Sequence, residues 1–193
     1  MNNTNPFIYS DDNKRYHTLN YYNKSSFNSK VFKAVIDAGF TCPNKDGTKG
    51  TGGCIYCMGG SGYFTEKSDG EIYDSVKRQL AAEKERIYKK HPDSLITAYF
   101  QANTNTYAPV ATLKEAYTAA LDFGVHGISI GTRADCLPDD VIALLCDINS
   151  KTHLTVELGL QTIHDKSAQI INRCYTYDAV SYTHLTLPTN SRV

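Results

Sequence analysis

Short apolar segments alternate with amphipathic segments along residues 30–173, and this order constrains the fold more than any other feature of the sequence. A strand and a helix together recur about every 30 residues, which is the length of a strand–helix–strand unit. The pattern predicts strands at 30–37, 94–102, 126–131 and 153–160, and helices at 68–91, after Pro109, after Pro138 and at 164–173. Strands that are short and apolar are typical of a sheet covered on both faces. We therefore expect an α/β fold with a parallel sheet, either open or curling into a barrel.

A polar loop follows each predicted strand. These loops span residues 39–65, 103–107, 132–136 and 161–165. In parallel sheets, binding and catalytic side chains gather at the carboxyl ends of the strands. The sequence therefore predicts a functional site built from these four loops.

The first of these loops contains three cysteines. Eleven residues separate Cys42 from Cys54, and two separate Cys54 from Cys57. Three interpretations stay open, and the first is that the cysteines are ordinary reduced thiols. The second is a zinc site, whose fourth ligand would have to come from a distant part of the chain. The third is a 4Fe-4S cluster, which normally takes four thiolates, so that three would leave one iron open.

Composition argues against three classes of protein: nucleic-acid binders with a broad basic surface, membrane-spanning proteins and exported proteins. The 193 residues are 41% hydrophobic and carry a formal net charge of zero, which excludes the broad basic surface of a typical nucleic-acid binder. No apolar run approaches the roughly 20 residues of a membrane span, and the polar start lacks an export signal. We expect a cytoplasmic protein without a membrane partner, with its six cysteines reduced.

Four ordered segments resemble one protein family. They are GFTCPNKDGTKGTGGCIYC (39–57), AYFQANTNTYAP (98–109), GISIGTRADCLPDDVIALL (127–145) and VELGLQTIHDKSAQIINR (156–173). Together they resemble the radical SAM superfamily and, within it, the bacterial YhcC-type family, a relative of the Elongator catalytic subunit. The resemblance covers residues 30–178 and implies a partial parallel (β/α) barrel, with about four of six units present.

The resemblance implies a metal site and part of a cofactor site. Cys42, Cys54 and Cys57 would each bind one iron of a 4Fe-4S cluster, and Tyr56 would pack near the adenine of S-adenosyl-L-methionine. Three polar residues stand where the superfamily holds the amino group of the methionine moiety, and which of them makes that contact stays open: Gln101, Asn103 and Thr104.

Two later loops would complete the cofactor site. Arg133 is expected to hold the methionine carboxylate, because a guanidinium offers paired donors, although pairing with Asp135 at the surface is an alternative. Glu157 would accept from the ribose hydroxyls or the amino group, with Gln161 one layer above it. A carboxylate in an apolar strand needs a partner, for which Arg133 is a candidate.

Three parts of the chain depart from this resemblance, and the first is Ala134, which stands where the family usually has Pro. Cys174 and Tyr175 stand where the family has Gly-His, and SYTHLTLPTNSRV (181–193) matches nothing in it. We expect 181–193 to be a non-native, irregular tail with few contacts. The predicted organisation is an irregular lead-in at 1–30, the N-terminal part of a radical SAM core at 31–180, and the tail. A chain truncated in this way would hold the cluster site without being a whole enzyme.

The implied function is reductive cleavage of S-adenosyl-L-methionine to a 5′-deoxyadenosyl radical that acts on an unknown substrate. The electron would come from a donor of flavodoxin or ferredoxin type, and RNA as the substrate rests on the Elongator kinship alone. The alternative is a non-catalytic zinc- or iron-binding interaction module, directed to RNA by the same kinship.

Overall fold

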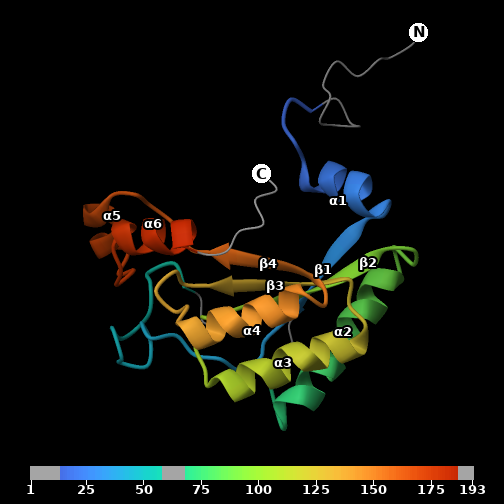
Figure 1. Ribbon diagram of the computed structural model, residues 1–193, viewed down its shortest axis with the longest axis horizontal. Coiled ribbons are helices and arrows are strands. Elements are labelled where there is room, and N and C mark those ends of the chain that lie inside the picture. Colours follow the sequence, from blue (N-terminus) through green and yellow to red (C-terminus); the bar gives the residue numbers. More distant parts are fainter. Residues whose placement is uncertain (1–13, 58–67, 187–193) are drawn as a thin grey trace.

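The computed structural model describes residues 14–57 and 68–186, with backbone only for 184–186. Its centre is a four-stranded parallel sheet in the order β1-β2-β3-β4 (Figure 1). The strands are β1 (Val31–Ile36), β2 (Leu95–Phe100), β3 (Gly127–Thr132) and β4 (His153–Leu158). Each lies within the segment predicted for it, give or take one residue, so the α/β class and the parallel sheet are confirmed.

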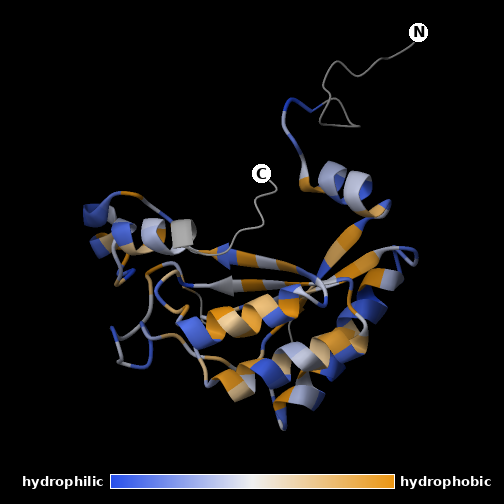
Figure 2. Cartoon of the chain, in the orientation of Figure 1, coloured by the Kyte–Doolittle hydropathy of each residue, from blue (hydrophilic) through white to orange (hydrophobic). Residues whose placement is uncertain are grey.

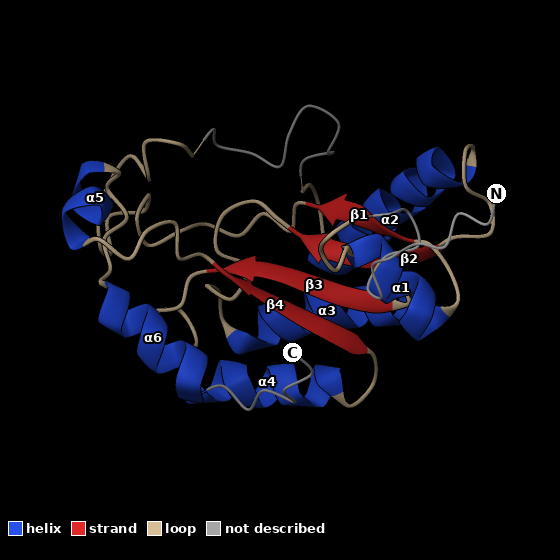
Figure 3. Ribbon diagram, turned by 90° about the horizontal axis from the view of Figure 1, so that it is seen from above, coloured by secondary structure: helices blue, strands red, loops and turns tan. Residues whose placement is uncertain are grey.

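Three long helices cover one face of this sheet. They are α2 (Ile72–Tyr88), α3 (Val110–Phe123) and α4 (Asp139–Asn149) (Figures 1 and 3). In the chain they follow β1, β2 and β3, respectively. Helix α3 follows Pro109 and ends at Gly124, which adopts a left-handed backbone with φ of 83°, as the sequence predicts. No helix in the described part of the chain has both the length and the apolar character needed to cross a membrane.

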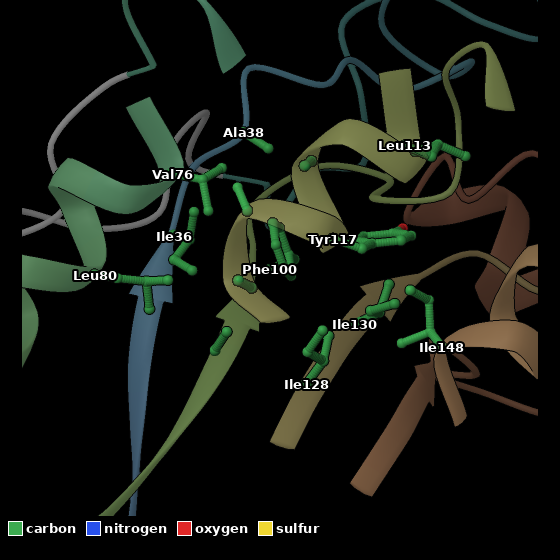
Figure 4. Packing of buried hydrophobic residues seen from close by; sticks show 14 of the residues in the cluster. Ile36, Ala38, Val76, Leu80, Phe100, Leu113, Tyr117, Ile128, Ile130 and Ile148 are labelled. Carbon is green, nitrogen blue, oxygen red and sulfur yellow. The ribbon is translucent and has the colours of Figure 1, made fainter. Parts of the chain in front are cut away.

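The core lies between the sheet and these helices. Alternate strand residues point into it, among them Ile36, Phe100 and Ile130, and all three are fully buried. The helices contribute matching apolar stripes that include Leu80 and Tyr117 (Figures 2 and 4). Because burial of one large apolar side chain contributes about 1.5–3 kcal/mol, this layer is the main source of stability.

The lead-in is not wholly irregular, so that prediction is wrong for residues 19–27. They form helix α1 (Leu19–Phe27), which begins where the Thr18 hydroxyl accepts a hydrogen bond from the Tyr21 amide at 3.0 Å. Its last residue, Phe27, packs edge-on against the ring of His126, with centroids 4.3 Å apart. The helix is held by its cap and by aromatic contacts, and its sequence has no apolar period that would reveal it.

The expected irregular tail is also wrong in part. After α5 (Asp165–Ile170), helix α6 runs from Tyr177 to Thr186, through the boundary predicted at residue 180. Val180 is buried, and the Thr183 hydroxyl donates to the Ala134 carbonyl at 2.9 Å. Neither glycine nor proline interrupts 177–186, so the helix continues. Residues 187–193 lie outside the described part, and the non-native origin of the tail stays a prediction.

Candidate functional site

A cavity of about 540 Å³ opens at the carboxyl edge of the sheet. All ten residues that the sequence predicted for a metal or cofactor site line it: Cys42, Cys54, Tyr56, Cys57, Gln101, Asn103, Thr104, Arg133, Glu157 and Gln161. They come from all four loops or strand ends, which meet at this edge because the strands are parallel. The structure therefore brings the whole predicted set to one place.

The three cysteines of the first loop line this cavity, and the sulfur atoms of two of them lie beside N–H donors. The Asn44 side-chain amide donates to the Cys54 Sγ at 3.5 Å, and the Arg133 Nη1 lies 4.0 Å from the Cys42 Sγ. Across the described residues, no three His, Cys, Asp or Glu side chains form a group that could hold a single metal ion. The thiolate sulfurs of a four-iron cluster lie about 6–7 Å apart, so a cluster needs no such close group. The residue types and their N–H donors fit a cluster.

The cysteine loop is fastened to the chain that follows α5. The Ile55 amide donates to the Ile171 carbonyl at 3.1 Å, and the Asn172 side chain donates to the Gly53 carbonyl at 2.8 Å. In return, the Asn44 side-chain amide donates to the Asn172 carbonyl. Segments more than 110 residues apart in sequence thus hold the loop in place, and no local sequence signal predicts these bonds.

One side chain from each strand forms a polar layer on the face of the sheet opposite the core. Lys33 of β1 pairs with Glu157 of β4, and its ammonium lies 3.9 Å from the centre of the Tyr99 ring of β2. The Tyr99 hydroxyl donates to Glu157 at 2.9 Å and the Ser129 hydroxyl of β3 donates to it at 3.1 Å. We call these four residues the polar layer.

The polar layer shows that the sheet is curved. Lys33 is in register with His153, four residues before Glu157. In a flat sheet the Cα atoms of Lys33 and Glu157 would lie about 19 Å apart, given strand spacings of ~4.8 Å and a rise of ~3.3 Å per residue. The ion pair therefore needs a sheet that curls toward this face, as the strands of a barrel do.

The partner of Glu157 is Lys33 and not Arg133, so that part of the prediction is wrong. Partial burial alone would raise the pKa of Glu157, but hydrogen bonds from Lys33 and Tyr99 lower that pKa below its ordinary value. Burial, and then the hydrogen bond to Glu157, raise the pKa of Tyr99 to about 12. A negative carboxylate and a neutral phenol therefore face the cavity near neutral pH.

The loop after β2 separates the three residues that the sequence left as alternatives. The Asn103 side chain is occupied, because it donates to the Phe40 carbonyl at 2.8 Å and accepts from the Lys45 ammonium at 2.7 Å. The Gln101 side chain is exposed. The Thr104 hydroxyl is buried and has no hydrogen-bond partner among the described residues. Thr104 lines the cavity, but its hydroxyl oxygen is covered by protein atoms, so a ligand would reach it only after a local shift of this loop.

Arg133 pairs with Asp135, which was the alternative contact, but the pair is buried and does not lie at the surface. The Arg133 Nε and Nη2 donate to the two Asp135 oxygens at 2.9 Å each, and both side chains are about nine-tenths buried. Burial alone would raise the pKa of Asp135, but hydrogen bonds from Arg133 and Lys49 lower it. The paired donors of this guanidinium are already in use.

Two residues of the site had not been singled out as site residues from the sequence. The Tyr175 ring lines the cavity between two guanidinium groups, 4.6 Å from Arg133 and 4.5 Å from Arg173. Arg173 is fully buried and donates to the carbonyls of Thr162 and Tyr175 at 2.7–3.0 Å. The one sequence signal for these two residues was indirect: Cys174 and Tyr175 stand where the family has Gly-His.

Comparison with known proteins points to one group of relatives. The chain is 48% identical over 180 residues to YtqA of Bacillus subtilis and 38% identical over 153 residues to YhcC of Escherichia coli. These similarities support a YhcC-like family. A third relative, MJ0486 of Methanocaldococcus jannaschii, is 35% identical over 159 residues. No protein-family model matches the chain.

The YhcC-like similarity extends over most of this chain and over part of each relative. The matches take in 92%, 78% and 79% of the chain, but only 55%, 47% and 46% of YtqA, YhcC and MJ0486. The chain thus spans about half the length of these relatives, whose names state no activity. The chemistry of the site has to be argued from its own residues.

Proposed function

We propose that this chain forms the cluster- and cofactor-binding part of a radical SAM enzyme of the YhcC-like family. The observation that carries the proposal is the single cavity lined by all ten residues that the family resemblance implied. Three cysteines, together with residues that carry hydroxyl, amide and carboxylate groups, match what a cluster and a zwitterionic cofactor need. The curved parallel sheet supports a partial barrel of this type.

Each group of residues has a task in this proposal. Cys42, Cys54 and Cys57 hold three irons of a 4Fe-4S cluster. After a local shift of its loop, the Thr104 hydroxyl contacts the amino acid part of S-adenosyl-L-methionine, because it is a buried hydroxyl without a partner among the described residues. Glu157, kept negative by Lys33 and Tyr99, accepts hydrogen bonds from the ribose or the amino group.

A cluster held by Cys42, Cys54 and Cys57 would pass on one electron from a flavodoxin- or ferredoxin-type donor, and this reduction would cleave S-adenosyl-L-methionine to methionine and a 5′-deoxyadenosyl radical. So reactive a radical requires a site that excludes water. Tyr99 and Glu157 of the polar layer and the Tyr175 ring line the cavity from which water would have to be excluded. The substrate that loses hydrogen to the radical remains to be identified.

Anaerobic reconstitution with iron and sulfide tests the proposal. We expect one 4Fe-4S cluster per chain, and a reduced-cluster EPR signal that changes when S-adenosyl-L-methionine is added. The exposed Cys146 provides a control, since Cys146→Ser should leave both results unchanged. Tight binding of one zinc ion without a cluster would support the interaction module instead.

A further inference from the structure

The guanidinium of Arg133 is already paired with groups of the protein on its Nε–Nη2 edge, one of its two edges that can bind a carboxylate. Its Nε and Nη2 both donate to Asp135, and the Lys49 ammonium lies 2.5 Å from the same carboxylate. Bidentate recognition of a ligand carboxylate uses two such parallel N–H donors. Binding a ligand carboxylate there would require breaking a pair that is about nine-tenths buried, which is costly.

The remaining nitrogen of Arg133 points toward the cysteine loop. Nη1 donates to the Arg173 carbonyl at 3.2 Å and lies 4.0 Å from the Cys42 Sγ. The Tyr175 ring packs against the guanidinium plane, 4.6 Å away. Contacts on both edges and one face fix the guanidinium, so the donor beside Cys42 is held in place by the fold.

We propose that Arg133 is a positioning residue for Cys42 and, through it, for the cluster, and not a ligand for the cofactor carboxylate. This inference rests on the proposed function. Arg133 and Lys49 carry two positive charges against the one negative charge of Asp135, which leaves a net charge of +1 beside the thiol. Hydrogen bonds to the sulfurs and nearby charge set the reduction potential of iron–sulfur clusters. The group therefore favours the reduced cluster.

The test compares Arg133→Lys with the wild-type chain after reconstitution. Lysine keeps a cation for Asp135 but loses the donor that faces Cys42. We expect the equilibrium constant for cluster reduction to fall by about tenfold, which is a shift of about 59 mV to more negative potential for one electron. The affinity for S-adenosyl-L-methionine should stay within about twofold of wild type, since the cofactor does not contact this group.

Two further variants make the result decisive. Lys49→Met removes a half-exposed charge of the same group without touching Arg133, and should shift the potential in the same direction by less. Arg86→Lys changes a bidentate Arg–Glu83 pair on α2, outside the cavity, and should change neither quantity.

The opposite pattern overturns the inference. A tenfold loss of cofactor affinity in Arg133→Lys, with the potential unchanged, would show that Arg133 binds the cofactor carboxylate. A cluster whose potential is unchanged in both Arg133→Lys and Lys49→Met would reject the inference and leave the proposed function standing. A wild-type chain that forms no cluster would reject both.

Discussion

The two faces of the sheet are built from the same four strands, but one is apolar and the other is polar. On the face covered by α2, α3 and α4, alternate residues such as Ala34, Phe100 and Ile128 are fully buried among apolar side chains. On the other face, each strand contributes one member of the polar layer. Because strand residues alternate between faces, one set of short strands supplies both an apolar core and a polar face.

The two regions also differ in how completely their buried polar groups are bonded. Under the helices, the Gln79 side chain both accepts from the Asp37 amide and donates to the Asp37 carbonyl, each at 2.9 Å. At the carboxyl edge, the Thr104 hydroxyl and the Asn44 Oδ1 are buried without a partner among the described residues. His126 Nε2, at the amino end of β3, is also buried without such a partner, so only the two atoms near the cavity bear on a ligand.

The largest expected effect comes from the helix-covered face. Phe100→Ala should lower the free energy of unfolding by about 3–5 kcal/mol, because it empties a fully buried site that packs edge-on against Tyr117 at 5.2 Å. Urea denaturation measures this loss. Ile170→Ala on α5, where the side chain is 74% exposed, is the control and should change stability by less than about 0.5 kcal/mol. Equal losses of unfolding free energy in the two variants would contradict the claim that the helix-covered core is the main source of stability.

A change at the carboxyl edge should separate stability from binding. Thr104→Val keeps the shape of the side chain and removes a buried hydroxyl without a partner, so stability should rise by about 1 kcal/mol. The affinity for S-adenosyl-L-methionine should fall by about tenfold, because the lost hydrogen bond to the ligand has no replacement. Denaturation and equilibrium binding measure the two effects. Lower stability with unchanged affinity in Thr104→Val would mean that the hydroxyl serves the fold.

The polar layer should appear in the pH dependence of stability. The pKa of Glu157 is lowered in the folded chain, so its stabilising contribution is present above the unfolded-state value of 4.5 and is lost as pH falls through the lower folded-state pKa. Glu157→Gln should remove this part of the acid limb. The effect should be under about 1 kcal/mol, because the Glu157 side chain is 38% exposed. Urea midpoints between about pH 3 and pH 7 test this, and an identical acid limb in both chains would contradict it.

Local pattern was enough for most of the fold. The apolar strands and the stripes of α2, α3 and α4 carry their own periodicity, and Pro109 and Gly124 mark the ends of α3. Helix α1 was missed, because it depends on a cap and on aromatic contacts with residues about 100 positions away, such as His126. Helix α6 was missed because residues 181–193 match nothing in the family and sustain no helical apolar period, although no glycine or proline interrupts 177–186.

The sequence predicted which residues meet at the cavity, but not the contacts that they make there. The rule that polar loops meet at the carboxyl ends of parallel strands places all ten predicted residues at one cavity. The partner of Glu157 could not be found this way, because Lys33 lies 124 residues away and reaches it only across a curved sheet. The partner of Arg133 could not be predicted from the sequence either, because its guanidinium could bond to Asp135 or to a ligand. The structure shows the bonds to Asp135.

The most direct test of the central claim is the iron and sulfide content of single cysteine variants after anaerobic reconstitution. The account predicts about four irons and four sulfides per wild-type chain, as a 4Fe-4S cluster requires. Cys42→Ser, Cys54→Ser and Cys57→Ser should each lose most of this content, whereas Cys146→Ser and Cys174→Ser, at exposed thiols, should keep it. Equal iron content in all five variants, or a wild-type chain that binds one zinc ion and no sulfide, would contradict the account.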